Sequence, residues 1–273
     1  MTRADLVFAL LVGILQGLLE WLPISSQGNV SLFTTLVTNV DPTVAVDLAL
    51  FVQLGTITSA AAYYREDIAD ALRNAPGWRP QSAFEPENAD TTFLVLASVA
   101  TGLVGIPLYF TLREAAAGLA GGLFIALIGA LLVATGLLQR ASEAIDVVGK
   151  ETPTFRDTLL VGALQGFAIL PGISRSGTTV SVMLLRGYEG PTALRLSFLL
   201  SIPASVGAAL LVLLSNGGLP GISPLAALVA LASSAVVGYL TIDALMRFVA
   251  RVPFWAVCVA LGSLAVLGGL AVA

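Results

Sequence analysis

The stretch VGILQGLLEWLPISSQG at residues 12–28 has a partner, VGALQGFAILPGISRSG, at residues 161–177. Each residue of the second copy lies 149 positions after its counterpart, and 8 of the 17 aligned positions are identical. Chance in so apolar a composition gives roughly one or two identities, so the sequence predicts an internal repeat. Both copies end in hydroxyl side chains and glycine, which a membrane segment does not need for stability. This pattern indicates a buried polar site built from two halves.

The composition indicates a membrane protein that crosses the bilayer several times. Hydrophobic residues make up 57% of the 273 residues and charged residues only 11%, against roughly 25% charged residues in an average soluble domain. We therefore expect an all-α polytopic membrane protein. The first apolar run is interrupted by Gln16 and Glu20, and no small-residue cleavage site follows it, so we expect mature structure there rather than a signal peptide.

The residue types that are missing exclude several kinds of chemistry. The chain contains no histidine and a single cysteine, Cys258. This excludes intrachain disulfides, cysteine-rich metal sites, Ser-His-Asp triads and zinc held by histidine. The net charge of −4 does not suggest a nucleic-acid partner. We expect no nucleic acid and no organic cofactor.

Six windows of about 20 mostly apolar residues are long enough to span a bilayer. They lie near residues 43–64, 91–112, 117–140, 191–214, 223–247 and 253–273. The two repeat segments, residues 4–38 and 157–188, differ because each has an apolar arm, a break of Pro, Gly and Ser, and a second short arm. Irregular backbone at membrane depth survives only where protein or a watery cavity satisfies its polar groups. We therefore predict two re-entrant helical hairpins in addition to the six spans.

The number of spans between the hairpins predicts an inverted repeat. Three spans separate them, an odd number, so the hairpins enter from opposite faces and their tips are expected to meet near the midplane. We expect a single membrane domain, residues 1–273, with a first repeat at 1–145 and a second at 146–273. We interpret the 65–90 loop between the first two spans as a solvated linker.

The cations predict the orientation in the cell membrane, because cytoplasmic loops carry an excess of Lys and Arg. Two cations, Arg3 and Arg113, fall on one face of the predicted arrangement. The ten on the other face are Arg65, Arg73, Arg79, Arg140, Lys150, Arg156, Arg186, Arg195, Arg247 and Arg251. This distribution places both termini outside and the loops at 65–90 and 141–156 in the cytoplasm.

Glycine pairs four residues apart occur at equivalent positions of the two repeats. They are Gly13 with Gly17 and Gly162 with Gly166. Small residues at this spacing let helix backbones approach closely in lipid. We expect these faces to pack the two hairpins against each other.

Glu20 is the first polar residue that stability does not explain. A carboxylate inside an apolar arm costs about 2.5 to 3.5 kcal/mol on insertion scales unless it is protonated or paired. Gln16 precedes it by one helical turn and shares its face, so the two side chains could orient a water, a hydroxyl or a metal ion. A purely structural, hydrogen-bonded acid is the alternative.

Arg175 is the second such residue, at a glycine-flanked break where the next helix is expected to begin. Unpaired N–H groups at a helix start, an Arg fork and nearby hydroxyls together make an anion site, with phosphate the most natural ligand. The alternative is an Arg that only snorkels toward the membrane surface or pairs with Glu20 to hold the hairpins together. The acid occurs only in the first repeat and the guanidinium only in the second, an arrangement that favours phosphoryl transfer.

The two signature stretches, residues 16–28 and PGISRSGTT at 171–179, resemble those of the undecaprenyl pyrophosphate phosphatase family, membrane enzymes associated with bacitracin resistance. FVQLG at 51–55 and SFLLSIP at 197–203 also resemble that family, so the similarity covers nearly the whole chain. The resemblance implies hydrolysis of a polyprenyl diphosphate to the monophosphate and inorganic phosphate, which recycles a lipid carrier of cell-wall or glycan assembly. It further implies an outward-opening site, a divalent cation such as magnesium or calcium, and a homodimer.

The resemblance assigns catalytic roles to Glu20, Ser26 and Arg175. Gln16 stands where many members have glutamate, so Glu20 and Gln16 are the only candidate metal ligands. Asn29 stands where members usually have histidine, so a histidine-based mechanism cannot operate, and either Ser26 or a water activated by Glu20 must attack. The expected substrate-binding residues are Gln16, Ser25, Gln27, Gly28, Asn29, Ser174, Ser176, Gly177 and Thr178.

Two other functions are compatible with the same residues. Inverted repeats with broken helices are a transporter architecture, so a transporter or flippase for a lipid phosphate or small anion would use the same anion clamp without hydrolysis. A membrane protein that has lost catalysis through the Asn29 change is the third possibility. Phosphate release from a prenyl diphosphate separates the enzyme from both.

Overall fold

The computed structural model describes residues 3–38, 40–74, 78–118, 121–143, 149–249 and 252–273. Across these ranges the regular structure is helical, apart from one isolated bridge between Lys150 and Tyr188. The first half contains α1 (Arg3–Leu19), α2 (Ser26–Thr38), α3 (Pro42–Tyr63), α4 (Arg65–Asn74), η2 (Pro80–Ser82), α5 (Ala89–Gly118) and α6 (Gly121–Ser142). The second half contains α7 (Phe155–Gly166), η3 (Phe167–Ile169), α8 (Arg175–Leu185), α9 (Gly190–Asn216), α10 (Pro224–Val249) and α11 (Phe254–Ala271). The all-α prediction is confirmed.

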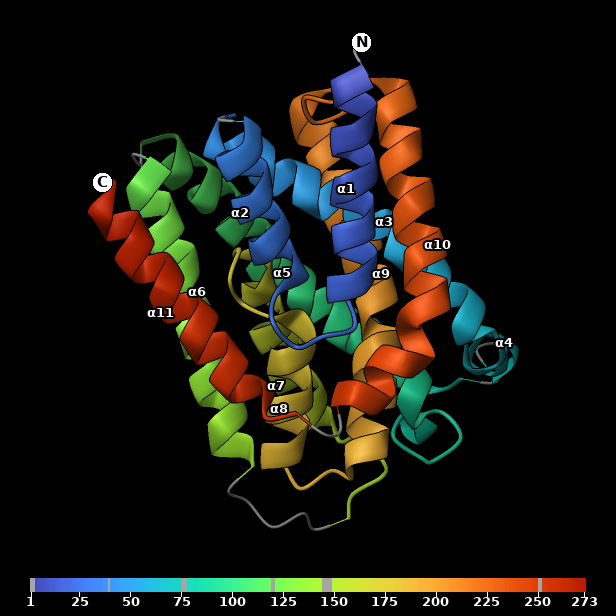
Figure 1. The fold of residues 1–273 in the computed structure, drawn as a ribbon. Coiled ribbons are helices and arrows are strands. Elements are labelled where there is room, and N and C mark those ends of the chain that lie inside the picture. Colours follow the sequence, from blue (N-terminus) through green and yellow to red (C-terminus); the bar gives the residue numbers. More distant parts are fainter. Residues whose placement is uncertain (1–2, 39, 75–77, 119–120, 144–148, 250–251) are drawn as a thin grey trace.

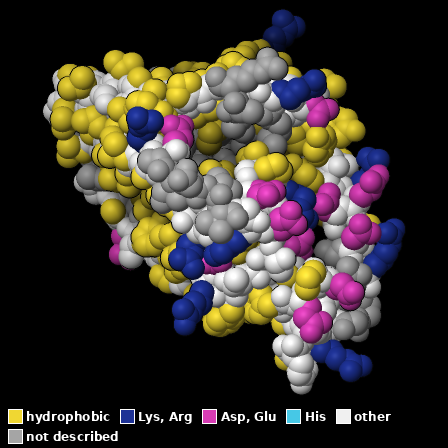
Figure 2. All heavy atoms as spheres, turned by 90° about the horizontal axis from the view of Figure 1, so that it is seen from below, with side chains coloured by type: hydrophobic (Ala, Val, Ile, Leu, Met, Phe, Trp, Pro, Cys, Tyr) yellow, Lys and Arg dark blue, Asp and Glu magenta, His cyan; other side chains and the backbone are white. Residues whose placement is uncertain are grey.

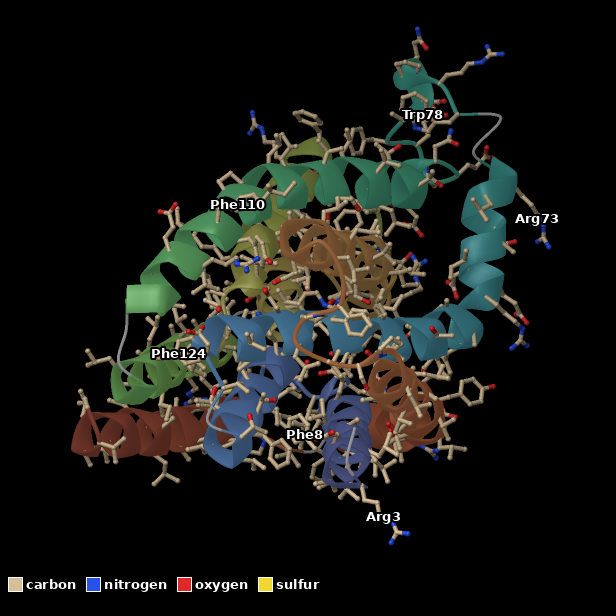
Figure 3. All side chains as sticks on the ribbon, turned by 90° about the horizontal axis from the view of Figure 1, so that it is seen from above. Arg3, Phe8, Arg73, Trp78, Phe110 and Phe124 are labelled. Carbon is tan, nitrogen blue, oxygen red and sulfur yellow. The ribbon has the colours of Figure 1, made fainter. Side chains whose placement is uncertain are left out.

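Six of the described helices are long and apolar enough to cross a membrane: α3, α5, α6, α9, α10 and α11. They coincide with the six predicted windows, and the chain is a multi-pass membrane protein. Helix α3 is the most enclosed, with 78% of its most apolar window buried, whereas α11 has only 22% buried. Viewed from the end that carries Arg3, α3 crosses the middle of the bundle and α5 follows one side (Figure 3). The centre of the bundle is therefore α3, whereas all four leucines of α11 are exposed on the outside of the bundle.

Both repeat segments consist of a helix, a break and a second helix. In the first, residues 20–25 separate α1 from α2, and in the second, η3 and residues 170–174 separate α7 from α8. Helix α1 starts at the end of the molecule that carries both termini, α7 starts near the opposite end, and the two breaks lie at middle height (Figure 1). Segments far apart in sequence thus bring their broken backbones to the same level.

The glycine faces pack differently from the prediction. Helix α1 packs against α10, and α7 packs against α5, so neither glycine face touches the other hairpin. A Cβ atom on Gly17 would lie 2.8 Å from Cβ of Val237 on α10, and one on Gly166 would lie 2.6 Å from Cβ of Val104 on α5. The spacing correctly indicated close helix approach, but the expectation that these faces join the two hairpins was wrong. Each face instead joins one repeat segment to a membrane-spanning helix of the other half.

The end of the bundle opposite the termini is strongly charged. Figure 2 shows Lys, Arg, Asp and Glu side chains gathered on this face. Part of it is the 65–90 loop, which contains the helix α4 rather than being a plain linker. Arg195 at the start of α9 pairs with Asp90 at 2.7 Å and with Asp67 of α4 at 3.5 Å. Arg195 thus attaches both α4 and the start of α5 to the start of α9.

Candidate active site

A cavity of about 940 Å³, including its open mouth, lies where the two breaks meet α3, α5 and α9. Of the predicted site residues, seven line it: Glu20, Ser25, Ser26, Gln27, Ser174, Arg175 and Ser176. Among the described residues that line it, Glu20 is the only carboxylate and Arg175 the only cation. Two repeats therefore contribute opposite charges to one cavity.

Glu20 is held by three partners that come from both repeats. Its Oε2 accepts a hydrogen bond from Nε2 of Gln16 at 2.6 Å and another from Oγ of Ser26 at 2.7 Å. Its Oε1 forms an ion pair with Nη2 of Arg175. The carboxylate is only 5% exposed, so these partners offset the cost of burying its charge. The acid that the sequence singled out thus sits beside a hydroxyl and a guanidinium.

Arg175 is fixed on its other side by helix α9. Its Nη1 donates to the carbonyl oxygen of Ser201 at 3.1 Å and to Oγ of Ser205. Arg175 is the first residue of α8, and Ser174 caps that helix by accepting from the Gly177 N–H at 3.1 Å. The guanidinium and the positive end of α8 therefore both face the cavity, as an anion site requires.

The serine shared by the two repeats has the same structural role in both. Ser25 accepts from the Gly28 N–H at 3.3 Å at the start of α2, as its counterpart Ser174 accepts from Gly177 at the start of α8. Two helix N-termini therefore open on the cavity. Ser25 has a positive φ of 58°, a conformation that costs about 1 to 3 kcal/mol when a residue other than glycine adopts it. The hydrogen bonds that Ser25 accepts from the Gly28 N–H and from the Gly172 N–H of the second break offset this cost.

Contacts between the two breaks use several of the predicted binding side chains. Oγ of Ser25 accepts from the Gly172 N–H at 3.1 Å, and Nε2 of Gln27 donates to the Ile169 carbonyl at 3.0 Å. Gly172 adopts a φ of 105°, which glycine tolerates without strain. A Cβ on Gly28 would lie 2.7 Å from the Gly172 backbone nitrogen. The tips therefore touch directly, and these residues position the cavity walls.

The remaining predicted site residues are not among those that line the cavity. Asn29 donates from Nδ2 to the carbonyl oxygens of Ile24 at 2.8 Å and Ser25 at 3.0 Å, so its amide is used within its own turn. Gln16 donates to Glu20 from outside the cavity lining, and Gly28 and Gly177 lie in the first turns of α2 and α8. Thr178 has a buried hydroxyl with no partner among the described residues. The Asn29 side chain thus supports the first turn of α2.

The described side chains could hold a divalent cation only together with ligands from water and from the phosphates of a substrate. Across the described residues no group of three or more Asp, Glu, His or Cys could hold one. Glu20 provides one carboxylate, and Gln16 has a buried Oε1 with no described partner. Magnesium is commonly held by one or two carboxylates, waters and the phosphates of a substrate. Glu20 and Gln16 would be the protein ligands, and the cation would neutralise phosphate charge.

The sequence reasoning missed four side chains that shape the site. Gln53 on α3 and Ser205 on α9 line the cavity beside Arg175. On α6, Gln139 donates to the Pro23 carbonyl at 2.6 Å, and Thr135 accepts from the Ser174 N–H at 3.2 Å. The available signal was a polar residue inside a span, which membrane helices seldom carry without a structural or functional role.

Fold and site together define a class: a helical membrane protein whose two broken segments meet at a cavity lined, among the described residues, by one acid and one arginine. The chain belongs to the family described as Bacitracin resistance protein BacA, which matches residues 9–264.

Relatives that match over the whole length agree with this membership. An undecaprenyl-diphosphatase of Haloarcula marismortui is 54% identical over 270 residues, covering 98% of each chain. An undecaprenyl-diphosphatase of Methanococcoides burtonii is 38% identical, covering 95% of this chain and 96% of the relative, and one of Methanothrix thermoacetophila is 38% identical, covering 94% of each. The resemblance found in the signature stretches is therefore confirmed along the chain.

Proposed function

We propose that this protein is an integral membrane phosphatase that hydrolyses an undecaprenyl-type diphosphate to the monophosphate and inorganic phosphate, and so recycles a lipid carrier. The observation that carries the proposal is the meeting of Glu20, Ser26 and Arg175 in one buried cavity. Family membership and the names of the full-length relatives support the same reaction. Transport of a lipid phosphate is not favoured, because none of these comparisons points to it.

In the proposed reaction Arg175 and the N-termini of α2 and α8 bind the diphosphate and neutralise its charge. Oγ of Ser26 lies 2.7 Å from Oε2 of Glu20, so the carboxylate can accept the hydroxyl proton as the oxygen attacks the terminal phosphorus. The bridging P–O bond breaks and the lipid monophosphate leaves. Water then hydrolyses the phosphoserine. In the alternative, Glu20 activates a water that attacks directly, and Ser26 orients it.

The walls of the cavity suit a lipid substrate. Gly102, Gly105 and Ile106 of α5 and Pro203 and Gly207 of α9, none of them charged, also line it. Ile106 is 48% exposed, so this wall continues to the outer surface of the bundle between two membrane-spanning helices. An apolar opening at that place fits a prenyl chain that stays in the bilayer while its diphosphate enters the polar end.

Phosphate release by purified protein in detergent tests the proposed function. We expect wild type to release phosphate from a long-chain prenyl diphosphate, and Ser26→Ala to lose about a hundredfold or more of kcat if Ser26 is the nucleophile. Folding of the variant is checked by its thermal midpoint. Chelation of divalent cations in the same assay tests the predicted cation, with full activity after chelation arguing against it.

Two results would change the proposal. Wild type that binds the diphosphate without releasing phosphate would contradict the enzyme assignment and favour a binding or transport role. A fully active Ser26→Ala variant would contradict the serine route and leave the water activated by Glu20. Asn29 contacts only its own turn among the described partners, so neither route passes through it.

We further propose that α1 with α2, and α7 with α8, form re-entrant hairpins of an inverted repeat with boundaries near residue 145, and that both termini face outward. The opposite starting ends of α1 and α7 support this, as do the matching contacts of α1 with α10 and of α7 with α5. The charged face opposite the termini would then be cytoplasmic.

A cysteine added after Ala273 tests this orientation, because Cys258 is buried and gives little background. We expect an impermeant thiol reagent to label it in intact cells. Protection in intact cells, with labelling only after lysis, would contradict the orientation. The homodimer stays a prediction, for which sedimentation of the detergent-solubilised protein is the measurement.

A further inference from the structure

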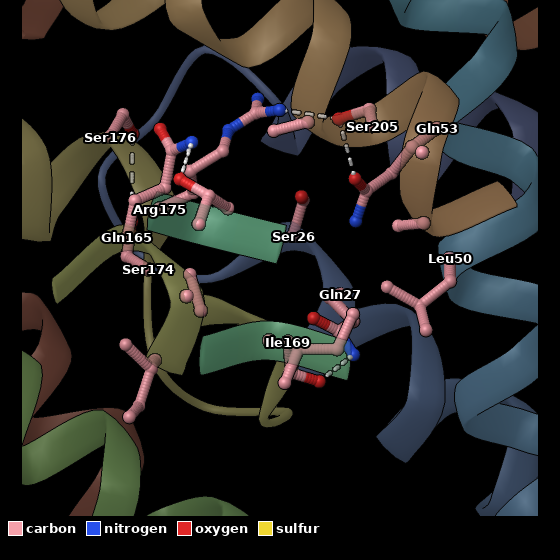
Figure 4. A pocket seen from close by; sticks show the side chains of 18 of the residues that line it. Ser26, Gln27, Leu50, Gln53, Gln165, Ile169, Ser174, Arg175, Ser176 and Ser205 are labelled. Carbon is pink, nitrogen blue, oxygen red and sulfur yellow. Dashed lines mark hydrogen bonds between the residues drawn. The ribbon is translucent and has the colours of Figure 1, made fainter. Parts of the chain in front are cut away.

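Gln53 is a buried glutamine of α3 that none of the steps above uses. Its side chain is 8% exposed and lines the cavity, in a helix whose other buried residues are mostly apolar. It stands across the cavity from the two breaks, next to Ser205 and Arg175 (Figure 4). A buried amide in the central membrane helix is costly unless its hydrogen bonds are made. The question is what its amide group binds.

A chain of hydrogen bonds fixes the direction in which this amide points. Nη1 of Arg175 can only donate, so Oγ of Ser205 accepts from it. The Ser205 hydroxyl hydrogen is thus available for Oε1 of Gln53, 3.1 Å away. If the amide were reversed, its N–H₂ group would face the Ser205 hydroxyl, and the hydroxyl hydrogen would lose Oε1 of Gln53 as its acceptor. The oxygen of Gln53 therefore faces Ser205, and Nε2 faces the other way.

Nε2 of Gln53 consequently points into the cavity, as Figure 4 shows. We propose that Gln53 is a substrate-binding residue whose amide N–H₂ donates to the anionic headgroup, held in that orientation by Arg175 through Ser205. This inference rests on the proposed lipid diphosphatase function. Ser205 is 2% exposed and acts as the positioning residue. Because its hydroxyl accepts from Arg175, it donates its hydrogen to Oε1 of Gln53 and so fixes the amide.

The position also suits a headgroup with more than one phosphate. Arg175 and Gln53 reach the cavity from α8 and α3, and Ser26 reaches it from α2. A diphosphate has enough acceptor oxygens for donors on several walls, whereas a monophosphate has fewer. Gln53 is therefore expected to strengthen binding of the diphosphate substrate more than binding of the monophosphate product.

Steady-state kinetics of three variants test the inference. Gln53→Leu removes the donor, and we expect KM for the diphosphate to rise about tenfold or more, as for a lost hydrogen bond to a charged group. Gln53→Glu keeps an acceptor for Ser205 but places a negative charge beside the headgroup, so KM should rise further. Ser205→Ala leaves the amide unoriented and should raise KM by less than Gln53→Leu does. In all three, kcat should change less than KM.

The control is Gln81→Glu, the same change at an exposed glutamine of η2 outside the cavity, which should leave KM unchanged. If Gln53→Leu and Gln53→Glu fold with KM within about twofold of wild type, the inference is wrong. If wild type releases no phosphate, the proposed function fails, and equilibrium binding of farnesyl diphosphate then decides about Gln53. Weaker binding by Gln53→Leu than by wild type would support its role, and equal binding would overturn it.

Discussion

Replacing Arg175 is expected to have the largest effect of any single change in the site. Arg175→Ala should lower kcat/KM by about a thousandfold or more, the range that removal of a transition-state arginine gives in phosphoryl transfer. The reason is that Arg175 is the only cation that lines the cavity among the described residues. The measurement is phosphate release from the prenyl diphosphate, with KM and kcat determined separately, and both are expected to suffer.

Arg175→Ala also leaves Glu20 buried without its cation, which can unfold the protein, so Arg175→Lys is the sharper variant. Lysine keeps a positive charge near Glu20 but cannot hold the carboxylate, the Ser201 carbonyl and Ser205 at once. We expect a folded protein with strongly reduced activity. Arg186→Lys is the matched control. Arg186 forms an ion pair with buried Asp157, with 2.5 Å between Nε and Oδ1, and it does not line the cavity. Wild-type activity of Arg175→Lys would contradict the proposed clamp.

Glu20→Gln is expected to have the second largest effect and a different kinetic signature. Glutamine keeps the shape of the side chain and can still accept from Ser26, but it cannot take up a proton. We expect kcat to fall by about a hundredfold to ten thousandfold, as for loss of a general base. KM should not rise, because Arg175 no longer has a carboxylate competing with the diphosphate.

Asp47→Asn is the control for Glu20→Gln. Asp47 is a buried carboxylate of α3 that accepts from the Tyr109 hydroxyl at 2.9 Å and pairs with Arg113 at 3.5 Å, and it does not line the cavity. Its change tests whether loss of any buried charge lowers turnover. A kcat of Glu20→Gln within about tenfold of wild type would contradict the role of Glu20 as base and favour the structural acid.

The two variants together separate catalysis from structure. If Glu20 and Arg175 only hold the breaks together, both changes should lower the thermal midpoint and should not split kcat from KM. If they act as proposed, Glu20→Gln lowers kcat alone, whereas Arg175→Lys also raises KM. The ion pair between them is compatible with either role, so the kinetic pattern decides.

Hydropathy and the repeat predicted much of the fold because both depend on local sequence. A span needs a run of apolar residues, and the six windows match α3, α5, α6, α9, α10 and α11. The breaks follow from Pro, Gly and Ser, and the equivalent serines Ser25 and Ser174 cap α2 and α8. The sequence was less informative about the partners of each helix face. A glycine pair indicates close approach, but the helix that approaches is chosen by the whole bundle.

The sequence by itself determined the membrane class, the two broken segments and the residues too polar for lipid, Glu20 and Arg175. It could do so because the free-energy cost of a charge or a break in lipid depends on the residue itself. Only the tertiary structure decided that Gln53 and Ser205, which are 152 positions apart in the sequence, join them from α3 and α9. The direction of the Gln53 amide depends on the Ser205 hydroxyl, which accepts from Arg175 and donates to Gln53. This dependence exists only once α3, α8 and α9 have come together.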